Sequence, residues 1–373
     1  MTVSSALILL LGVALVASTT WLPPRATRFI GTALLALALG VVLRFALGSV
    51  AAGVVSLVIA VLAFRYAPLL VLRRVTFLVP ALVVLMFATV LLMFEAPGNP
   101  FANERVASPE VEQTLRARYG VPKSGAAFFA IYLRRLLVDG SLGPSIKVQG
   151  RSVEDLLAPA FPVSLSLGLL ALLLSLAIGV TLGVRAGLKP NSSSDHASMG
   201  LALLGISVPN FVIGAVFMIV FALWLGWFPV AGWGGYAHLV LPAITLALPN
   251  AAVIARLARG GTVDIMQQDF VRTARAKGLP ESWVIGKHAL RGALLPVVSY
   301  LGPAAAAIMT GSFVVEVLFG VPGMGQWFVK GAINRDYSVV LGTAMIYFAL
   351  ITFFNLAVDL AYVWLDPRVR ERA

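Results

Sequence analysis

The stretch VRTARAKGLPESWVIGKHALRGALLP, Val271–Pro296, lies between two segments that are apolar enough to cross a bilayer, and it carries five Lys or Arg residues. A short turn would suffice to join two membrane helices, so a basic segment of this length predicts an element with a structure of its own. Its pattern indicates a short amphipathic helix over 270–278, because glycine at 278 readily takes the left-handed conformation that ends a helix. A second helix is predicted from Trp283 to about Leu294, leading back to the membrane.

Composition places the whole chain in the membrane class. Of the 373 residues, 60% are hydrophobic and only 12% are charged, whereas a soluble domain is about 25% charged. The chain has no cysteine, which excludes disulfides, thiolate metal sites and a cysteine nucleophile. The net charge of +12 leaves two explanations, nucleic-acid binding or the basic loops of a membrane protein.

Nine apolar runs are long enough for a membrane helix, which needs about 20 residues. They lie at 4–22, 29–47, 49–65, 75–95, 162–184, 199–227, 239–255, 294–319 and 340–365. The pair at 29–65 is interrupted by Arg44 and Gly48, so one long tilted helix or a re-entrant hairpin is an alternative there. The run at 4–22 is interpreted as a retained helix and not as a cleaved signal peptide.

The positions of the basic residues predict the orientation, because loops rich in Lys and Arg stay in the cytoplasm. Most of the 28 Lys and Arg residues fall in linkers that alternate to one side of the membrane: 23–28, 65–74, 185–198, 256–293 and 366–373. This side is predicted to be the cytoplasm, with the C-terminus inside and the N-terminus outside. The charge is thus spread as topology requires, without a basic and aromatic groove, so nucleic-acid binding is not predicted.

The long segment 96–157 is predicted to lie outside the membrane on the other side. Ser108 followed by Pro109 predicts the start of a helix that runs to about Tyr119. The stretch FFAIYLRRLLVDGSLG predicts an interfacial helix that ends at Gly140, and Ser152 predicts the start of the helix that leads into the next span after Pro162.

Motifs of catalysis are absent from the sequence. It has no G-x-x-x-x-G-K-[ST] phosphate-binding loop, no H-E-x-x-H and no G-x-S-x-G, and its three histidines are not spaced as metal ligands. No catalytic residue, metal site or cofactor of its own is therefore predicted for this chain. Glu316 is the ionisable residue within a span that is most suited to a translocation path, with Ser312 one turn before it, although a position near the hydrated interface is the alternative.

The motifs quoted next carry a resemblance that extends over most of the chain. FVRTARAKGLPESWVIGKHALRGALLPVVSY resembles the EAA loop of ATP-binding-cassette importer permeases, with Arg272-Thr273-Ala274 in place of the Glu-Ala-Ala that names it. LRRVTFLVPALVV, APGNPF, FPVSLSLGLLALLLSLAIGV, SVPNFVIG, GSFVVEVLFGVPGMGQ, AINRDYSVV and DPRVRER are similar, in order, to the B-type membrane subunit of oligopeptide permeases. The similarity runs from about Leu72 to Arg372.

This resemblance implies a fold and a set of partners. The fold would be an all-α polytopic type I permease, with a six-helix core at 72–373 and about three extra transmembrane helices at 1–71. The subunit would lie in a bacterial inner membrane with a homologous C-type permease, two ATPase subunits that bind ATP and Mg, and an extracytoplasmic peptide-binding protein. Dipeptide and nickel permeases share the scaffold and remain alternatives, and a gradient-driven transporter is a more distant one.

The resemblance also implies site residues. The ATPase-coupling element would be Arg272, Thr273, Ala274, Arg275, Ala276, Lys277, Gly278 and Leu279, with Ala274 and Gly278 allowing close approach and Arg275 and Lys277 meeting polar ATPase groups. An interfacial helix on anionic lipid is the alternative for this stretch. Asn334, Arg335, Asp336 and Tyr337 would face the binding protein or the released peptide, or else form a loop cap through an Arg335–Asp336 network.

Overall fold

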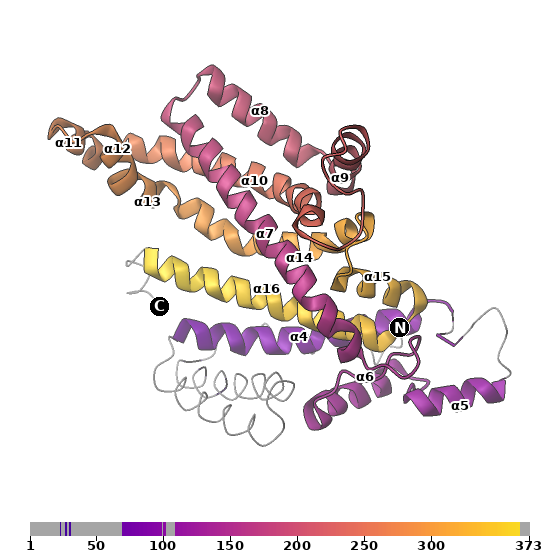
Figure 1. Cartoon of the computed structure of the whole chain (residues 1–373). Coiled ribbons are helices and arrows are strands. Elements are labelled where there is room, and N and C mark those ends of the chain that lie inside the picture. The colour runs from indigo at the N-terminus through magenta and orange to yellow at the C-terminus, as the bar shows by residue number, and fades with distance from the viewer. Residues whose placement is uncertain are drawn as a thin grey trace. The chain divides into compact units, whose positions relative to one another are not determined.

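The computed structural model describes residues 23, 27, 30, 69–98, 100–101 and 109–365, and this part of the chain is helical (Figure 1). An isolated bridge between Pro144 and Ser152 is the one β pairing in these residues. The spans predicted at 4–22, 29–47 and 49–65 lie outside the described residues, apart from Ile30.

Within the described residues, five helices are long and apolar enough to cross a membrane. They are α4 (Leu69–Glu95), α7 (Val153–Leu188), α10 (Tyr236–Met266), α14 (Leu295–Leu318) and α16 (Tyr337–Leu365). Each coincides with a predicted span, so these five predictions are confirmed. Two helices exceed their predicted apolar runs: α7 begins at Val153, directly after the predicted cap at Ser152, and α10 continues to Met266.

The span predicted at 199–227 is a bent pair of helices, which together are long and apolar enough to form one broken span or a re-entrant loop. The chain forms α8 (Ser193–Ser207) and then α9 (Asn210–Phe217), and the pair is bent by 107° at the break between them. Pro209 explains the break, because the residue before a proline is pushed out of the helical region, and Val208 is extended with φ −96° and ψ 127°. A π-helical turn, Met218–Trp224, continues α9.

The segment between the first two described spans contains the predicted short helices. α5 (Pro109–Tyr119) begins at the predicted proline, and α6 (Gly125–Arg134) passes through a π-helical turn, Arg135–Asp139, to Gly140 at φ +63°. Ser152 caps α7 as predicted, because its Oγ accepts from the Asp155 N–H at 3.2 Å while the Asp155 carboxylate accepts from the Ser152 N–H at 2.9 Å.

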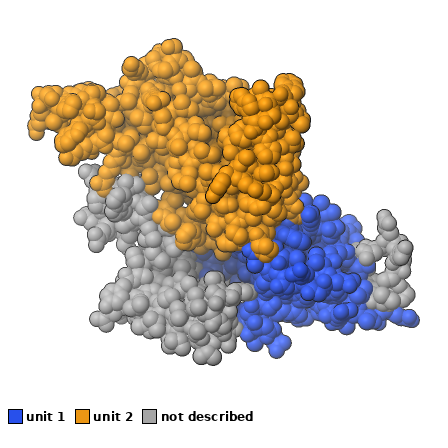
Figure 2. Space-filling view, in the orientation of Figure 1, with its two compact units in different colours: residues 1–158, 327–348, 373 blue, residues 159–326, 349–372 orange. Residues whose placement is uncertain are grey.

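The chain divides into two compact units, shown in Figure 2. One consists of residues 1–158, 327–348 and 373, and the other of 159–326 and 349–372. The first unit contains an aromatic core in which the ring of Tyr337 lies 4.7 Å from that of Phe94 and 5.8 Å from that of Phe128.

Close backbone contact between α7 and α10 organises the second unit. A side chain at Gly179, Gly183 or Gly187, spaced four residues apart on α7, would overlap a backbone carbonyl of α10. Small residues at this spacing let two membrane helices pack backbone to backbone. α10 also contacts α8, α9, α13 and α14, so it is the central helix of this unit.

Candidate functional site

The basic loop, residues 271–296, follows the end of α10. It folds into α11 (Asp269–Ala276), α12 (Glu281–Trp283), a π-helical turn (Val284–Ala289) and α13 (Leu290–Ala293). Figure 1 shows α11, α12 and α13 gathered at one end of α10. The predicted pair of short helices is confirmed as local structure.

Gly278 ends the first helix of the basic loop. Its φ is +75°, its N–H donates to the Arg275 carbonyl at 2.9 Å, and the Leu279 N–H donates to the Ala274 carbonyl at 3.4 Å. An L side chain is strained in this left-handed conformation, so glycine is needed here for the turn. Space is not the reason, because a Cβ at this position would meet no atom within 4 Å.

The inner face of α11 is a small apolar core. Val271, Ala274 and Val284 are buried together, and Met266 and Leu279 pack against them. Ala274 is 6% exposed, which corrects the expectation that this residue lies on the docking surface. Its small side chain instead allows α11 to pack on the second half of the loop.

The outer face of α11 carries the exposed residues. Arg272, Thr273, Ala276, Lys277 and Gly278 are all exposed, and Phe270, an apolar ring, is 47% exposed. Arg272 lies 3.7 Å from the carboxylate of Asp269, and because both side chains are exposed to solvent, this ion pair contributes little stability. A partner that reaches this face therefore meets two basic side chains around an open glycine turn.

Arg275 has a partner within the basic loop. Its Nη2 and Nε donate to the Glu281 carboxylate at 2.6 and 3.2 Å, which ties α11 to α12. The hydrogen bonds and attraction raise the pKa of Arg275 and lower the pKa of Glu281. Arg275 thus holds the two helices of the loop together, and because its side chain is still 43% exposed, its expected contact with an ATPase group stays a prediction.

The second half of the basic loop returns the chain to α14. Trp283 is 53% exposed, and the ammonium of Lys287 lies 4.4 Å from the centre of its ring. At the base of the loop, a side chain at Gly261 of α10 would overlap the carbonyl of Ala293, so the two segments touch through their backbones.

Glu316 is fully buried and holds the start of α15 (Met324–Asn334). Its carboxylate accepts from the Ser164 hydroxyl at 2.7 Å and from the Gly325 N–H at 2.7 Å, while Ser164 Oγ accepts from the Met324 N–H at 2.8 Å. A carboxylate at a helix N-terminus also interacts favourably with the helix dipole. Because Glu316 is 0% exposed and its partners lie within the protein, the alternative of a hydrated position is wrong, whereas a place in a translocation path stays a prediction.

The glycines of GVPGMGQ, 320–326, make room for Glu316. A side chain at Gly323 or Gly325 would overlap its carboxylate, and Gly320 has φ +65°. Ser312, one turn before Glu316, is also buried and donates to the Met309 carbonyl at 2.8 Å.

Arg335 and Asp336 hold different parts of the segment 96–157. The Arg335 guanidinium donates to the carbonyls of Ala96, Pro97 and Gly98. The Asp336 carboxylate is buried and accepts from the Ser145 hydroxyl and from the Lys147 N–H. The alternative of a loop cap is thus close to the arrangement found, but each charged residue binds a separate partner.

The two residues that flank this pair differ in exposure. Tyr337 is 4% exposed within the aromatic core of the first unit, and Asn334 is exposed at the end of α15. Of the six residues predicted for the outer region, Asn334 is exposed, whereas the other five are buried or half-buried.

A buried ion pair in the second unit was not predicted. Asp195 is 2% exposed, and Arg259 of α10 binds its carboxylate. The sequence carries a signal for half of it, since Ser192 three residues before Asp195 is typical of a helix start. Nothing local pointed to Arg259. Among the described side chains no group of three His, Asp or Glu could hold a metal ion.

Comparison with known proteins gives the class. Residues 179–371 match the family described as binding-protein-dependent transport system inner membrane component. The oligopeptide transport system permease protein OppB of Haemophilus influenzae is 44% identical over 300 residues, which cover 80% of this chain and 98% of that protein. The OppB of Escherichia coli K12 is also 44% identical, and the dipeptide transport system permease protein DppB of Bacillus subtilis is 41% identical over 298 residues.

The chain belongs to this family of inner-membrane transport components. It is accordingly a multi-pass permease subunit of the inner membrane. Members of this family are transport subunits and are not themselves enzymes. Two solved structures are more distantly similar: the MetNI methionine ABC transporter, with a TM-score of 0.48 over 56% of this chain and 95% of that one, and an amino acid ABC transporter, with 0.43 over 55% and 92%, each at 16% identity.

Proposed function

We propose that this chain is the membrane-spanning subunit of an ATP-driven peptide importer and forms half of its translocation path. The observation that carries the proposal is the 44% identity to oligopeptide permeases along 98% of their length. The segment 72–373 is the permease core in this proposal, and 1–71 adds helices before it. A homologous C-type permease would form the other half, and an extracytoplasmic peptide-binding protein would deliver the substrate.

The basic loop is the proposed docking element for the ATPase subunits, which bind ATP and Mg themselves. The structure supports this role through the exposed face of α11, where Arg272 and Lys277 flank the open turn at Gly278. The apolar inner core and the Arg275–Glu281 pair make the loop a folded unit, so a push on α11 is carried to the base of the loop.

Oligopeptides are the proposed substrates, and dipeptides or nickel are the alternatives on the same scaffold. The dipeptide permeases of Bacillus subtilis and Lactococcus lactis are 41% and 34% identical, against 44% for the oligopeptide permeases. Uptake of a labelled oligopeptide, challenged with unlabelled oligopeptide, dipeptide or nickel, separates the three. Competition by dipeptide or nickel alone would replace the proposed substrate.

The coupling role is tested with Lys277→Glu in the whole complex. Charge reversal at this exposed residue should lower ATP-dependent peptide uptake by at least about tenfold, because like charges repel across a desolvated contact. Lys189→Glu, at an exposed lysine that lies outside the basic loop, is the control and should stay within about twofold. Unchanged uptake by Lys277→Glu would remove this residue from the docking surface.

The energy source is tested separately. Uptake by the unaltered chain should require the ATPase subunits and ATP, and a collapsed ion gradient should leave it unchanged. Uptake that continues without ATPase subunits and follows an imposed ion gradient would reject the ATP-driven importer in favour of a gradient-driven transporter.

The proposed orientation places the basic loop and the C-terminus in the cytoplasm and 96–157 outside. Because the chain has no cysteine, single cysteines can report it directly. Lys123→Cys should react with a membrane-impermeant maleimide in intact cells, and Lys277→Cys only after the membrane is opened. The reverse pattern would invert the topology and exclude the loop as an ATPase contact.

A further inference from the structure

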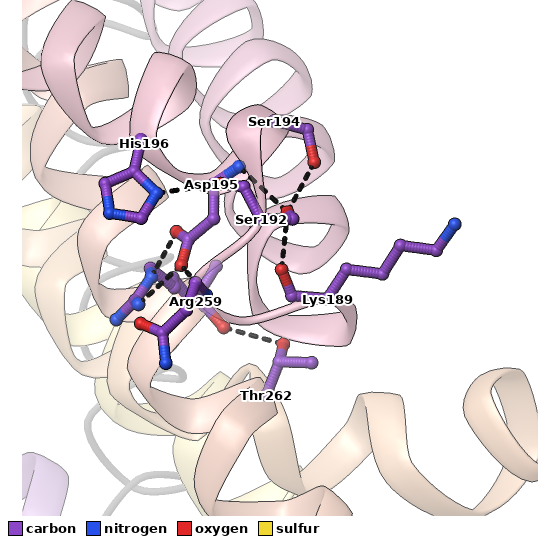
Figure 3. Close-up of polar contacts among 9 residues, drawn as sticks. Lys189, Ser192, Ser194, Asp195, His196, Arg259 and Thr262 are labelled. Carbon is purple, nitrogen blue, oxygen red and sulfur yellow. Dashed lines mark hydrogen bonds and ion pairs between the residues drawn. The ribbon is translucent and has the colours of Figure 1, made fainter.

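Asp195 and Arg259 form an ion pair between α8 and α10, in which the carboxylate is buried and the guanidinium is half-buried (Figure 3). Arg259 donates through Nε at 2.5 Å and through Nη2 at 2.7 Å, one bond to each carboxylate oxygen. The Asp195 side chain is 3% exposed and that of Arg259 is 30% exposed. A fork of this kind fixes both the distance and the relative orientation of the two helices.

The turn before α8 is built to present Asp195. Asn191 takes the left-handed conformation at φ +61°, and its N–H donates to the Asp195 carboxylate at 2.8 Å. Ser192 caps the helix by accepting from the Asp195 N–H at 3.3 Å. The carboxylate therefore has a donor from its own turn as well as from α10, and the turn, the first residues of α8 and α10 are held as one assembly.

Elsewhere α8 packs incompletely on its neighbours. A groove of about 530 Å³ lies between α7, α8, α9 and α10, and its lining is almost entirely apolar. Leu201, Leu203 and Leu204 of α8 are each more than 60% exposed. Near the other end of the helix, a Cβ at Gly205 would lie 3.2 Å from the Cβ of Ala252. The ion pair and the approach of Gly205 to Ala252 are thus two contacts of α8 with α10, one near each end of α8.

α10 connects this pair to the basic loop without a break. Arg259 lies seven residues before Met266, about 10 Å along the helix, and Met266 packs in the apolar core of α11. Gly261 touches the Ala293 carbonyl at the base of the loop. Displacement of α11 must therefore move the part of α10 that carries Arg259.

Stability alone does not account for such a pair. Removing the Asp195 carboxylate and part of the Arg259 guanidinium from water costs desolvation energy that their attraction roughly offsets, and apolar residues of similar size commonly stabilise a buried site as well. What the ion pair adds is a defined relative position, since a shift of either helix breaks both hydrogen bonds.

We propose that Asp195 and Arg259 are positioning residues that fasten α8 to the end of α10, so that α8 moves with the basic loop when the loop is displaced. This inference rests on the proposed function of the loop as the ATPase contact. It assigns to α8, and through the bend at Pro209 to α9, the first movement that follows ATPase closure.

The first test measures coupling in the reconstituted complex. Asp195→Asn and Arg259→Gln should each lower the amount of peptide taken up per ATP hydrolysed by at least about fivefold, while the ATPase subunits still co-purify, because the exposed face of α11 is unchanged. The double variant Asp195→Arg with Arg259→Asp should recover part of this ratio, which a loss of packing would not. Ratios within twofold of the unaltered chain for both single variants would overturn the proposal.

The second test replaces the ion pair by a covalent bond. The chain has no cysteine, and Gly205→Cys with Ala252→Cys places two thiols near the Cβ separation of about 3.8 Å that a disulfide needs. In the Asp195→Asn background the oxidised pair should restore the uptake per ATP, and reduction should abolish the gain. A crosslink that forms but leaves the uptake per ATP at the level of the reduced protein would overturn the proposal. This outcome would overturn it even if the Asp195→Asn protein can be purified only when the crosslink is present.

The rate of crosslinking itself gives a readout that does not depend on transport. If the ion pair holds α8 against α10, the two cysteines should form a disulfide several times more slowly when Asp195→Asn is also present than when Asp195 is unaltered. Equal rates would show that the ion pair does not hold the two helices together. Failure of the proposed function is distinguished from this, because it would show as the absence of ATP-dependent uptake by the unaltered chain.

Discussion

The basic loop and the outer residues Ser312–Tyr337 are both polar parts of an apolar chain, but the loop exposes its charged side chains, whereas the outer residues bury their carboxylates. The loop buries Val271 and Ala274 and exposes Arg272 and Lys277. In the outer residues the carboxylates of Glu316 and Asp336 are buried against N–H and hydroxyl donors of the chain. The loop is a folded element with exposed charge, whereas the buried charges of Ser312–Tyr337 hold turns and helix starts.

This difference follows from the cost of burial. A buried carboxylate must be hydrogen-bonded, so Glu316 and Asp336 bind N–H and hydroxyl groups of neighbouring segments and hold those segments in place. An exposed arginine or lysine costs little and remains able to bind another molecule. Exposure therefore separates the two sets of predicted site residues better than charge or position in the sequence does.

The largest effect should follow from Asp336→Ala. It leaves the Ser145 hydroxyl and the Lys147 N–H without their acceptor, and we expect a loss of about 3 kcal/mol in the free energy of unfolding. The melting temperature of the purified protein should fall, and protease should cut 96–157 faster. Asp139→Ala, at an exposed acid of the same segment, is the control. An unchanged melting temperature would mean that Asp336 is free to serve a partner, as the sequence suggested.

The base of the basic loop can be tested with two adjacent glycines. Gly261→Ala should destabilise by about 2 kcal/mol, because its methyl group overlaps the Ala293 carbonyl. Gly260→Ala meets no atom within 4 Å and should instead stabilise α10 by about 0.5 to 1 kcal/mol. Thermal unfolding of both variants measures the difference, and equal effects would show that the loop is not held at this point.

Ser164→Ala should have a smaller effect of about 1 to 2 kcal/mol. The hydroxyl links the Met324 N–H to the Glu316 carboxylate, so its removal leaves one donor and one acceptor unpaired. Ser166→Ala, two residues along α7, removes an exposed hydroxyl that bonds only to the Val163 carbonyl and should be nearly neutral. Similar melting temperatures for the two variants would contradict the anchoring role of Glu316.

The smallest effect is expected at Glu281. Its pKa is lowered by Arg275, so the ion pair stabilises the loop at pH values above the ordinary value of 4.5 and is lost as the pH falls through the lowered value. Relative to Glu281→Gln, amide exchange of α11 in the unaltered chain should be slower by only about twofold at pH 7, because the pair is exposed to solvent. The two proteins should converge in acid. A difference that persists at low pH would assign the effect to something other than this charge.

Local signals predicted the helix ends well. Pro109, Gly140, Ser152 and Gly278 each mark the boundary expected of them, because proline, glycine and capping side chains act on their own few residues. The apolar runs predicted five spans for the same reason. The run 199–227 is apolar enough for a span, but its hydropathy is continuous across Pro209, so the bend follows from the backbone restriction before a proline and not from hydropathy.

Side-chain partners were much harder to predict. For Glu316 and Arg335 the sequence left a role toward a substrate or partner protein beside a structural one, and it did not identify the hydrogen-bond partners found here, which lie up to 239 residues away in the same chain. Arg259 was counted only as one basic residue of a linker, and its pairing with the buried Asp195, 64 residues before it, was not predicted. Ala274 seemed suited to an interface by its small size, yet that size serves the packing of α11 on Val284.

The sequence by itself determined the helical membrane class, the boundaries of most described helices and the family, because hydropathy, caps and motifs are properties of short stretches. Only the tertiary structure decided which polar residues are exposed and which are buried with hydrogen-bond partners inside the protein. That choice depends on what lies across from each side chain, and a buried charge takes whichever donor the packing of distant helices brings within hydrogen-bond distance.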